Sequence, residues 1–156
     1  MRILIAVAAL SALGPAVARA QSAADTAAVV QVTRNVFDAM RKRDTTLLRS
    51  TFAPEARMIT AAAARDGSPR VQVETPDAFV AAVGKPSEAV WDERTYATEV
   101  RIDGNLATVW MEYDFYLGET FSHCGVDAFQ LARYAEGWKI VSLADTRQRE
   151  GCPTRN

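Results

Sequence analysis

Residues 106–147, with the sequence LATVWMEYDFYLGETFSHCGVDAFQLARYAEGWKIVSLADTR, decide the fold of this 156-residue chain. Three runs in this stretch have the length and residue pattern of long strands: 106–117, 121–133 and 138–147. Gly118-Glu119 separates the first two runs and Ala135-Glu136-Gly137 the last two, and turns as short as these join antiparallel neighbours. The stretch therefore predicts a β-meander.

The residues before the meander have the pattern of helices and shorter strands. Between Asp25 and Arg43, apolar residues recur at spacings of three and four, which is typical of an amphipathic helix. The other elements we expect are a helix at Thr45–Phe52, strands at Ala56–Ala62 and Val71–Glu74, a helix at Pro76–Gly84 and a strand at Arg94–Ile102. Helices followed by a long meander indicate a single α+β domain, with the helices packed on one face of an antiparallel sheet.

Residues 1–20 have the features of a secretory signal peptide, so the mature domain is expected to be residues 21–156. Met1-Arg2 is a short positively charged start, Ile3–Leu13 is apolar, and Ala18-Arg19-Ala20 matches an A-x-A cleavage site. The apolar run is shorter than the roughly 20 residues that a spanning helix needs, and the alternative is an uncleaved membrane anchor. We expect the protein to be exported, either to a periplasm or out of the cell.

Composition and charge exclude several classes of protein. The chain is 49% hydrophobic and 24% charged, which is ordinary for a globular domain and unlike disordered or collagen-like sequences. Removal of Arg2 and Arg19 with the signal peptide leaves 16 basic and 19 acidic residues, a net charge of −3. A mildly acidic chain without basic clusters argues against binding to nucleic acid or to an anionic membrane surface.

Cys124 and Cys152 are the only cysteines in the chain. An even number of cysteines in an oxidising compartment predicts a disulfide, and the alternative is two free or intermolecularly bonded thiols. The chain has a single histidine, so two cysteines and one histidine would not complete a zinc site. We expect neither a metal nor a cofactor.

The alternation along the meander predicts which residues face the helices. Side chains alternate across a strand, and residues paired across a hairpin share a face. Large apolar residues of two neighbouring strands align in this way and should pack against the helices: Phe129, Leu131, Trp138 and Ile140. The same parity assigns further residues to this inner face: Met111, Tyr113, Phe115, His123, Gly125, Asp127, Ser142 and Ala144.

One end of this inner face is expected to enclose a ligand cavity. The three small residues there, Gly125, Ser142 and Ala144, should leave space. Apolar side chains such as Met111 and Phe115 would contact a ligand in that space. A cavity with apolar walls and a few polar groups is the usual form of a small-molecule site.

Tyr113, His123 and Asp127 are the candidate catalytic residues around this cavity. His123 or Asp127 could act as a general base, and Tyr113 as a hydrogen-bond donor to a carbonyl. The alternatives are structural: a partly exposed histidine, a carboxylate paired with arginine or backbone, and a core tyrosine with a satisfied hydroxyl. His123 and Asp127 are about 13 Å apart at about 3.3 Å per residue, so a direct contact would need a bulge. Neighbouring strand residues face opposite sides, so His123 is not expected to activate Ser122 or Cys124.

The opposite face of the meander carries a second apolar set. Its members are Trp110, Tyr116, Val126, Ala128, Val141 and Leu143. A monomer rarely leaves such a stripe in water, whereas a sheet-to-sheet homodimer would cover it. Asp145 and Arg147 are expected to form surface or dimer-contact ion pairs outside the cavity.

Several segments together resemble the nuclear transport factor 2-like superfamily, and more narrowly its SnoaL-like or putative lumazine-binding bacterial group. The segments are Asp44 followed by Leu47-Leu48, Phe52-Ala53-Pro54-Glu55-Ala56, the helix Pro76–Val83 and Gly137-Trp138-Lys139-Ile140. The resemblance covers roughly residues 26–147. It implies a cone-shaped α+β barrel in which one curved sheet wraps the helices around a pocket, usually in a dimer.

The resemblance does not imply a single function, because a shared fold hosts many activities. Members of the superfamily include isomerases, dehydratases, polyketide cyclases and proteins that only bind. We expect an exported protein that binds a small apolar or aromatic molecule, with cofactor-independent isomerase, cyclase or dehydratase chemistry as its catalytic form. The alternative is a non-catalytic interaction or accessory domain that uses the sheet face.

Overall fold

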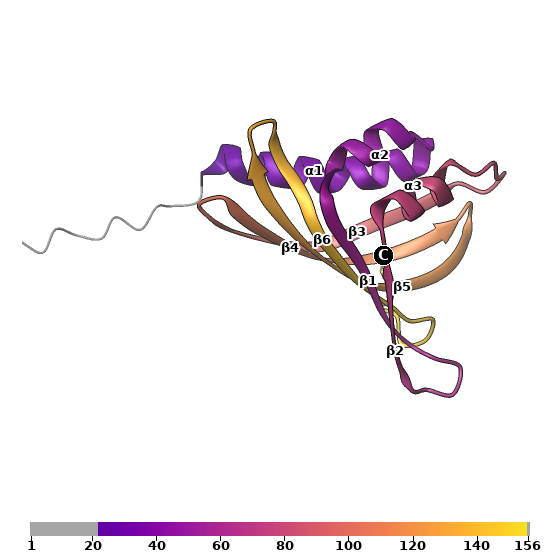
Figure 1. Ribbon diagram of the computed structural model, residues 1–156. Coiled ribbons are helices and arrows are strands. Elements are labelled where there is room, and N and C mark those ends of the chain that lie inside the picture. The colour runs from indigo at the N-terminus through magenta and orange to yellow at the C-terminus, as the bar shows by residue number, and fades with distance from the viewer. Residues whose placement is uncertain (1–21, 156) are drawn as a thin grey trace, which may run out of the picture.

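Three helices lie against one face of a six-stranded sheet in the computed structural model, which describes residues 22–155 (Figure 1). The predicted signal peptide, residues 1–20, lies outside the described residues. Within 22–155, no helix is long and apolar enough to cross a membrane. The arrangement confirms the predicted α+β fold.

Each helix begins after a residue whose side chain accepts a hydrogen bond from the first turn. The helices are α1 (Ala23–Lys42), α2 (Thr45–Thr51) and α3 (Pro76–Gly84). The hydroxyl of Ser22 accepts from the N–H of Asp25 at 3.0 Å, and Asp44 and Thr75 cap the other two helices. Such caps satisfy N–H groups that have no partner inside the helix, so these residues fix where the helices start.

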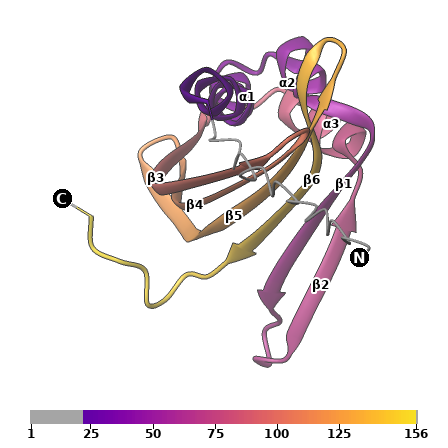
Figure 2. The ribbon, with the colours of Figure 1, turned by 90° about the vertical axis from the view of Figure 1, so that its left-hand side faces the viewer.

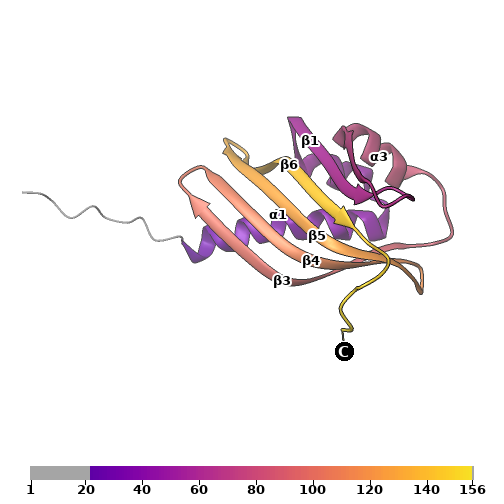
Figure 3. The same cartoon turned by 90° about the horizontal axis from the view of Figure 1, so that it is seen from below.

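The strands form one mixed sheet, in the order β2-β1-β6-β5-β4-β3. Their bounds are β1 (Phe52–Ala63), β2 (Pro69–Glu74), β3 (Trp91–Asp103), β4 (Leu106–Leu117), β5 (Thr120–Tyr134) and β6 (Gly137–Arg147). β1 runs parallel to β6, so the predicted antiparallel sheet is wrong at this one pairing. The helices cover one side of the curved sheet (Figure 2), and β3, β4, β5, β6 and β1 follow one another across the other side (Figure 3).

The buried core lies between the helices and the inner face of the sheet. Phe37 of α1 meets Phe129 of β5 edge to face, with ring centroids 6.1 Å apart. Leu131, Trp138 and Ile140 are buried in the same cluster. The part of the inner face near the β5–β6 turn is therefore assigned correctly by the sequence alternation.

A β-bulge interrupts the pairing of β5 with β6. Leu131 pairs with Ile140, but the preceding residue, Gln130, pairs with Ser142. Val141 is therefore an extra residue on β6, and beyond it the inward and outward positions of the strand are exchanged.

This exchange overturns five of the predicted positions. Ser142 and Ala144, expected in the cavity, lie on the outer face. Leu143, expected on the outer face, is buried and lines the cavity, as do Asp145 and Arg147. The alternation rule fails here because it assumes an uninterrupted strand.

Gly125 does not open space in the cavity, so that prediction is also wrong. A Cβ atom at this position would lie 1.9 Å from the carbonyl oxygen of Thr146 and 2.9 Å from a ring carbon of Tyr113. Glycine is required because the end of β6 passes close over β5. The space beside Gly125 is filled by the backbone of β6.

A disulfide joins Cys124 of β5 to Cys152 within the chain, with their Cα atoms 5.9 Å apart. The backbones of Cys124 and Gln148 exchange two hydrogen bonds of 2.9 Å. These contacts attach the segment after β6, residues 148–155, to the sheet; we call this segment the tail. The predicted disulfide is present in the structure as an intramolecular bond.

Candidate functional site

A cavity of about 280 Å³ lies between the helices and the inner face of the sheet. Its walls are mostly apolar and include Phe37, Met40, Met58, Phe79, Trp91 and Phe115. Six polar side chains also line it: Glu93, Tyr113, His123, Asp127, Asp145 and Arg147. The volume is at the small end of ligand sites, which span about 300–1,000 Å³.

The structure brings together part of the predicted site. Tyr113, Phe115, His123 and Asp127 line the cavity as expected. Met111 is buried on the inner face but is a core residue outside the lining. Three residues of the predicted site do not line the cavity: Gly125, Ser142 and Ala144. The bulge at Val141 turns Ser142 and Ala144 to the outer face, and backbone packs closely against Gly125.

The carboxyl groups of Glu93 and Asp127 lie close enough on the cavity wall to share a proton in a hydrogen bond. They come from β3 and β5, and β4 lies between these strands. Asp127 is buried, and its Oδ2 accepts no hydrogen bond from a donor group within residues 22–155. Two carboxylates cannot hydrogen-bond each other, so the contact requires a proton on one of them.

The surroundings of the two acids favour such a protonated form, because they raise the pKa of both carboxyl groups. Burial, opposed in part by the hydrogen bond from Asp127 and reinforced by the charge of Asp145, raises the pKa of Glu93 to about 7. Burial, the nearby Glu93 charge and proton donation to Glu93 raise the pKa of Asp127 well above its usual range. The pair therefore holds at least one proton at neutral pH, and above the Glu93 midpoint of about 7 the singly protonated form, with the proton on Asp127, predominates.

Asp145 and Arg147 form an ion pair beside these two acids. The Asp145 carboxylate accepts a 2.6 Å hydrogen bond from the Thr60 hydroxyl and another of 2.6 Å from Nε of Arg147. The positive charge of Arg147 lowers the pKa of both Glu93 and Asp127, which offsets part of the effect of burial. The pair thus sets the field at the polar end of the cavity.

His123 is a neutral imidazole on the cavity wall. Burial, followed by the positive charge of Arg147, lowers the pKa of His123 to about 4. Its Nδ1 lies 3.0 Å from the hydroxyl of Ser122, although alternation was expected to point these two neighbours to opposite faces. The reason is a second bulge: Phe115 pairs with His123 but Tyr116 with Phe121, which leaves Ser122 as the extra residue.

The hydroxyl group of Tyr113 forms a hydrogen bond within the protein. The hydroxyl donates a 2.8 Å hydrogen bond to the carbonyl of Thr146. Burial, followed by the charge of Glu93, raises the pKa of Tyr113 far above its usual value, so the phenol stays protonated. The predicted role as a donor to a ligand does not fit this contact, because the single proton is already directed at Thr146.

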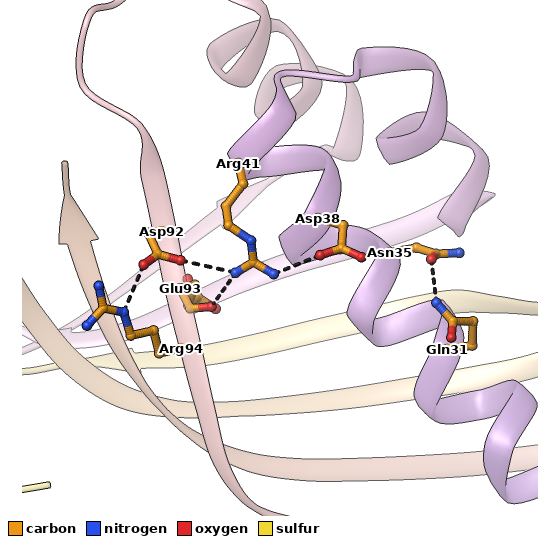
Figure 4. A network of polar contacts seen from close by, with 7 residues as sticks. All are labelled: Gln31, Asn35, Asp38, Arg41, Asp92, Glu93 and Arg94. Carbon is orange, nitrogen blue, oxygen red and sulfur yellow. Dashed lines mark hydrogen bonds and ion pairs between the residues drawn. The ribbon is translucent and has the colours of Figure 1, made fainter. Parts of the chain in front are cut away.

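Arg41 of α1 fixes the strand that carries Glu93. Its guanidinium donates to the carbonyl oxygen of Glu93 and to the carboxylate of Asp92, both at 3.1 Å, and to Asp38 at 2.8 Å (Figure 4). Arg94 also pairs with Asp92, at 2.8 Å. This network holds the start of β3 against α1, which positions the Glu93 side chain on the cavity wall.

The sequence did not predict three polar residues of the cavity wall. Glu93 lies just before the expected strand Arg94–Ile102, and a strand starting at Trp91 would have placed it on the inner face with Phe115. Asp145 and Arg147 were assigned outward because nothing in the residue types of β6 marks a bulge at Val141. Within residues 22–155, no cluster of three or more His, Cys, Asp or Glu side chains is arranged to hold a metal ion.

The fold and the cavity define a protein of the NTF2-like class. Residues 24–144 match the family described as putative lumazine-binding, which is most of the chain. The chain therefore belongs to the putative lumazine-binding family. No curated protein matches the sequence.

Solved structures of low sequence identity share the fold. An NTF2-like protein of unknown function from Shewanella baltica superposes with a TM-score of 0.64 at 16% identity, covering 83% of this chain and 98% of that one. A putative dehydratase of the NTF2-like family from Streptomyces avermitilis also gives 0.64 at 16% identity, covering 81% and 97%. An NTF2-like protein from Cytophaga hutchinsonii gives 0.64 at 13% identity, covering 82% and 100%. At such identities the likeness establishes the fold alone.

Proposed function

We propose that the cavity binds a small, largely apolar molecule and that the Glu93–Asp127 pair transfers a proton within it. The observation that carries this proposal is a pair of neighbouring carboxyl groups, both with raised pKa, on the wall of an apolar cavity. A carboxyl group whose pKa lies near 7 can both take and return a proton at neutral pH, whereas an ordinary glutamate is fully ionised there. The small volume favours a molecule of one or two rings.

The proposed reaction begins and ends with one proton on the pair. Glu93 takes a proton from a carbon beside the ligand's carbonyl group, which leaves an enolate and a pair carrying two protons. Return of a proton to another carbon gives an isomer, and delivery of a proton to a departing hydroxyl group releases water. Attack of the enolate on a second carbonyl would instead close a ring, and the alkoxide that forms takes the proton back from the pair. None of these reactions needs a cofactor.

Two neighbouring groups would assist this chemistry. As a neutral imidazole, His123 is proposed to hydrogen-bond the ligand through the ring nitrogen that Ser122 does not contact. The charges of Asp145 and Arg147 cancel in their ion pair. The negative charge of the carboxyl pair therefore leaves the polar end of the cavity with a net negative charge. This charge disfavours anionic ligands and favours neutral carbonyl compounds. A lumazine-like two-ring molecule, suggested by the family description, is one candidate.

Hydrogen exchange into a bound carbonyl compound would test this proposal. The protein is incubated in D₂O with lumazine and with a panel of small cyclic ketones and enones, and binding is measured by thermal shift and exchange by NMR. We expect one or more ketones to bind and to exchange their α-hydrogens with the wild type and with Glu99→Gln, an exposed control on β3. Asp127→Asn and Glu93→Gln should bind and not exchange. Binding without wild-type exchange would leave only a binding function.

We also propose that the protein is exported. The support is the signal-peptide pattern of residues 1–20 together with the intramolecular disulfide, because disulfides persist mainly in oxidising compartments.

The outer face of the sheet supports a second candidate function, as an interaction surface. A groove of about 520 Å³ lies there, and Trp110 on its wall is 52% exposed. Ala128 and Ala144 line the same groove. Exposed aromatic surface of this kind commonly marks a protein contact, and we propose a second copy of the chain as its occupant.

A further inference from the structure

The tail carries an arginine onto the outer face of the sheet. Nη2 of Arg155 lies 2.7 Å from a carboxylate oxygen of Glu112, and Nε lies 3.4 Å from Oδ2 of Asp114. The guanidinium carbon sits 4.1 Å from the centre of the Tyr96 ring. Two carboxylates and one aromatic face therefore surround a single guanidinium group.

The sheet itself, and not the tail, assembles these three residues. Tyr96 of β3 pairs directly with Glu112 of β4, and Asp114 lies two positions further on the same face of β4. Asp114 in turn pairs with Cys124, the residue that holds the tail through the disulfide. The arrangement is fixed by strand register, so it persists when the tail leaves.

Asp114 is the observation that points to a ligand. Its side chain is only 7% exposed, and its Oδ1 accepts no hydrogen bond from any donor within residues 22–155. A buried carboxylate is costly unless it is paired and hydrogen-bonded. Arg155 uses only one oxygen of this group, so the site offers more acceptor capacity than its present occupant fills.

We propose that Tyr96, Glu112 and Asp114 form a binding site for a guanidinium cation, occupied by the chain's own Arg155 and held closed by the Cys124–Cys152 bond. A guanidinium group is planar, has five N–H donors and stacks on aromatic rings, which matches two carboxylates beside a tyrosine face. A lysine ammonium is a compact point charge and matches only the carboxylates. Cys152 lies three positions before Arg155, so the disulfide keeps the arginine at a high local concentration near the site.

Emptying the site while the disulfide stays intact is the direct test. Wild type, Arg155→Ala and the control Arg101→Ala, an exposed arginine elsewhere on β3, are titrated with arginine amide and with lysine amide. Binding is followed by NMR of the Tyr96 ring. Arg155→Ala should bind arginine amide saturably, in about the millimolar range, and lysine amide at least about tenfold more weakly. Wild type and Arg101→Ala should show no saturable binding.

Two further variants complete the test. Arg155→Ala combined with Glu112→Gln should lose the binding, and Cys152→Ser should bind arginine amide more weakly than Arg155→Ala because its own arginine still competes. The proposed site is overturned if Arg155→Ala binds no better than wild type, if both amides bind equally, or if Glu112→Gln has no effect. A Cys152→Ser protein that behaves like wild type would overturn the role of the disulfide. Circular dichroism of each variant verifies that it is folded.

Discussion

The hydroxyl of Tyr113 and the carbonyl of Thr146, 33 positions apart in the chain, are joined by a 2.8 Å hydrogen bond. The bond links the middle of β4 to the end of β6, and it passes over Gly125 of β5. Asp145 and Arg147 flank Thr146 and line the cavity. The contact therefore fixes the charged wall of the site.

Adding a methyl group at Gly125 should destabilise the protein. A Cβ there would lie 1.9 Å from a backbone oxygen, so β6 must move. We expect Gly125→Ala to lower the free energy of unfolding by about 2–3 kcal/mol, measured by urea denaturation. Gly84→Ala is the control, because its Cβ would meet only the movable Thr45 methyl, and its change should stay within about 1 kcal/mol. Equal stability of Gly125→Ala and wild type would contradict the packing described for this site.

The raised pKa of Glu93 should make the stability of the protein depend on pH. The pKa of Glu93 rises from 4.5 to about 7 on folding, so the native state keeps a proton that the unfolded chain releases. Below about pH 4.5 this group is protonated in both states and does not lower the stability. The free energy of unfolding then falls as the pH rises from about 4.5 to about 7. Glu93→Gln should make this decrease smaller, with the remainder due to the raised pKa of Asp127, whereas Glu99→Gln should leave it unchanged. Parallel stability curves for wild type and Glu93→Gln would refute the shift.

Loss of the disulfide should reduce stability. The bond closes a separation of 28 residues, for which loop-closure entropy predicts roughly 3–4 kcal/mol. Urea denaturation of protein purified without reductant, compared with the same protein after reduction, measures this difference. The same preparation, denatured without reductant, should contain no thiol that reacts with an alkylating agent. Two reactive thiols would show that the bond does not form.

The outer-face groove should be covered by a second molecule. Sedimentation at micromolar concentration is expected to give a dimer for the wild type. Trp110→Glu should give a monomer, because a charge without a partner would be buried at the contact. Val90→Glu, an exposed apolar residue before β3, is the matched control and should remain dimeric. A monomeric wild type would exclude this use of the groove.

Local sequence signals were sufficient to predict most of the fold. The cap residues Asp44 and Thr75 and the turns around Gly118 and Gly137 mark where elements begin and end, and these signals depend on a few neighbouring residues. The parallel pairing of β1 with β6 could not be derived in this way, because it joins segments about 80 residues apart.

The site was predictable only in part, for a specific physical reason. Tyr113 and Asp127 lie on uninterrupted stretches, so alternation gave their face correctly. The extra residues at Ser122 and Val141 change the parity of their strands without any distinctive residue type. The extra residue at Val141 also brings Asp145 to the inner face. The raised pKa values of Glu93 and Asp127 arise from burial and from nearby charges, which residue spacing in the sequence does not show.

The central claim is that Glu93 and Asp127 hold one proton between them in the cavity. Side-chain carboxyl ¹³C NMR of these two residues, followed from about pH 4 to about pH 9, measures this directly. The account predicts a midpoint of about 7 for Glu93 and an Asp127 that is still protonated at neutral pH. If instead both carboxyl groups titrate near their ordinary values and are ionised at neutral pH, the pair holds no proton and the proposed chemistry fails.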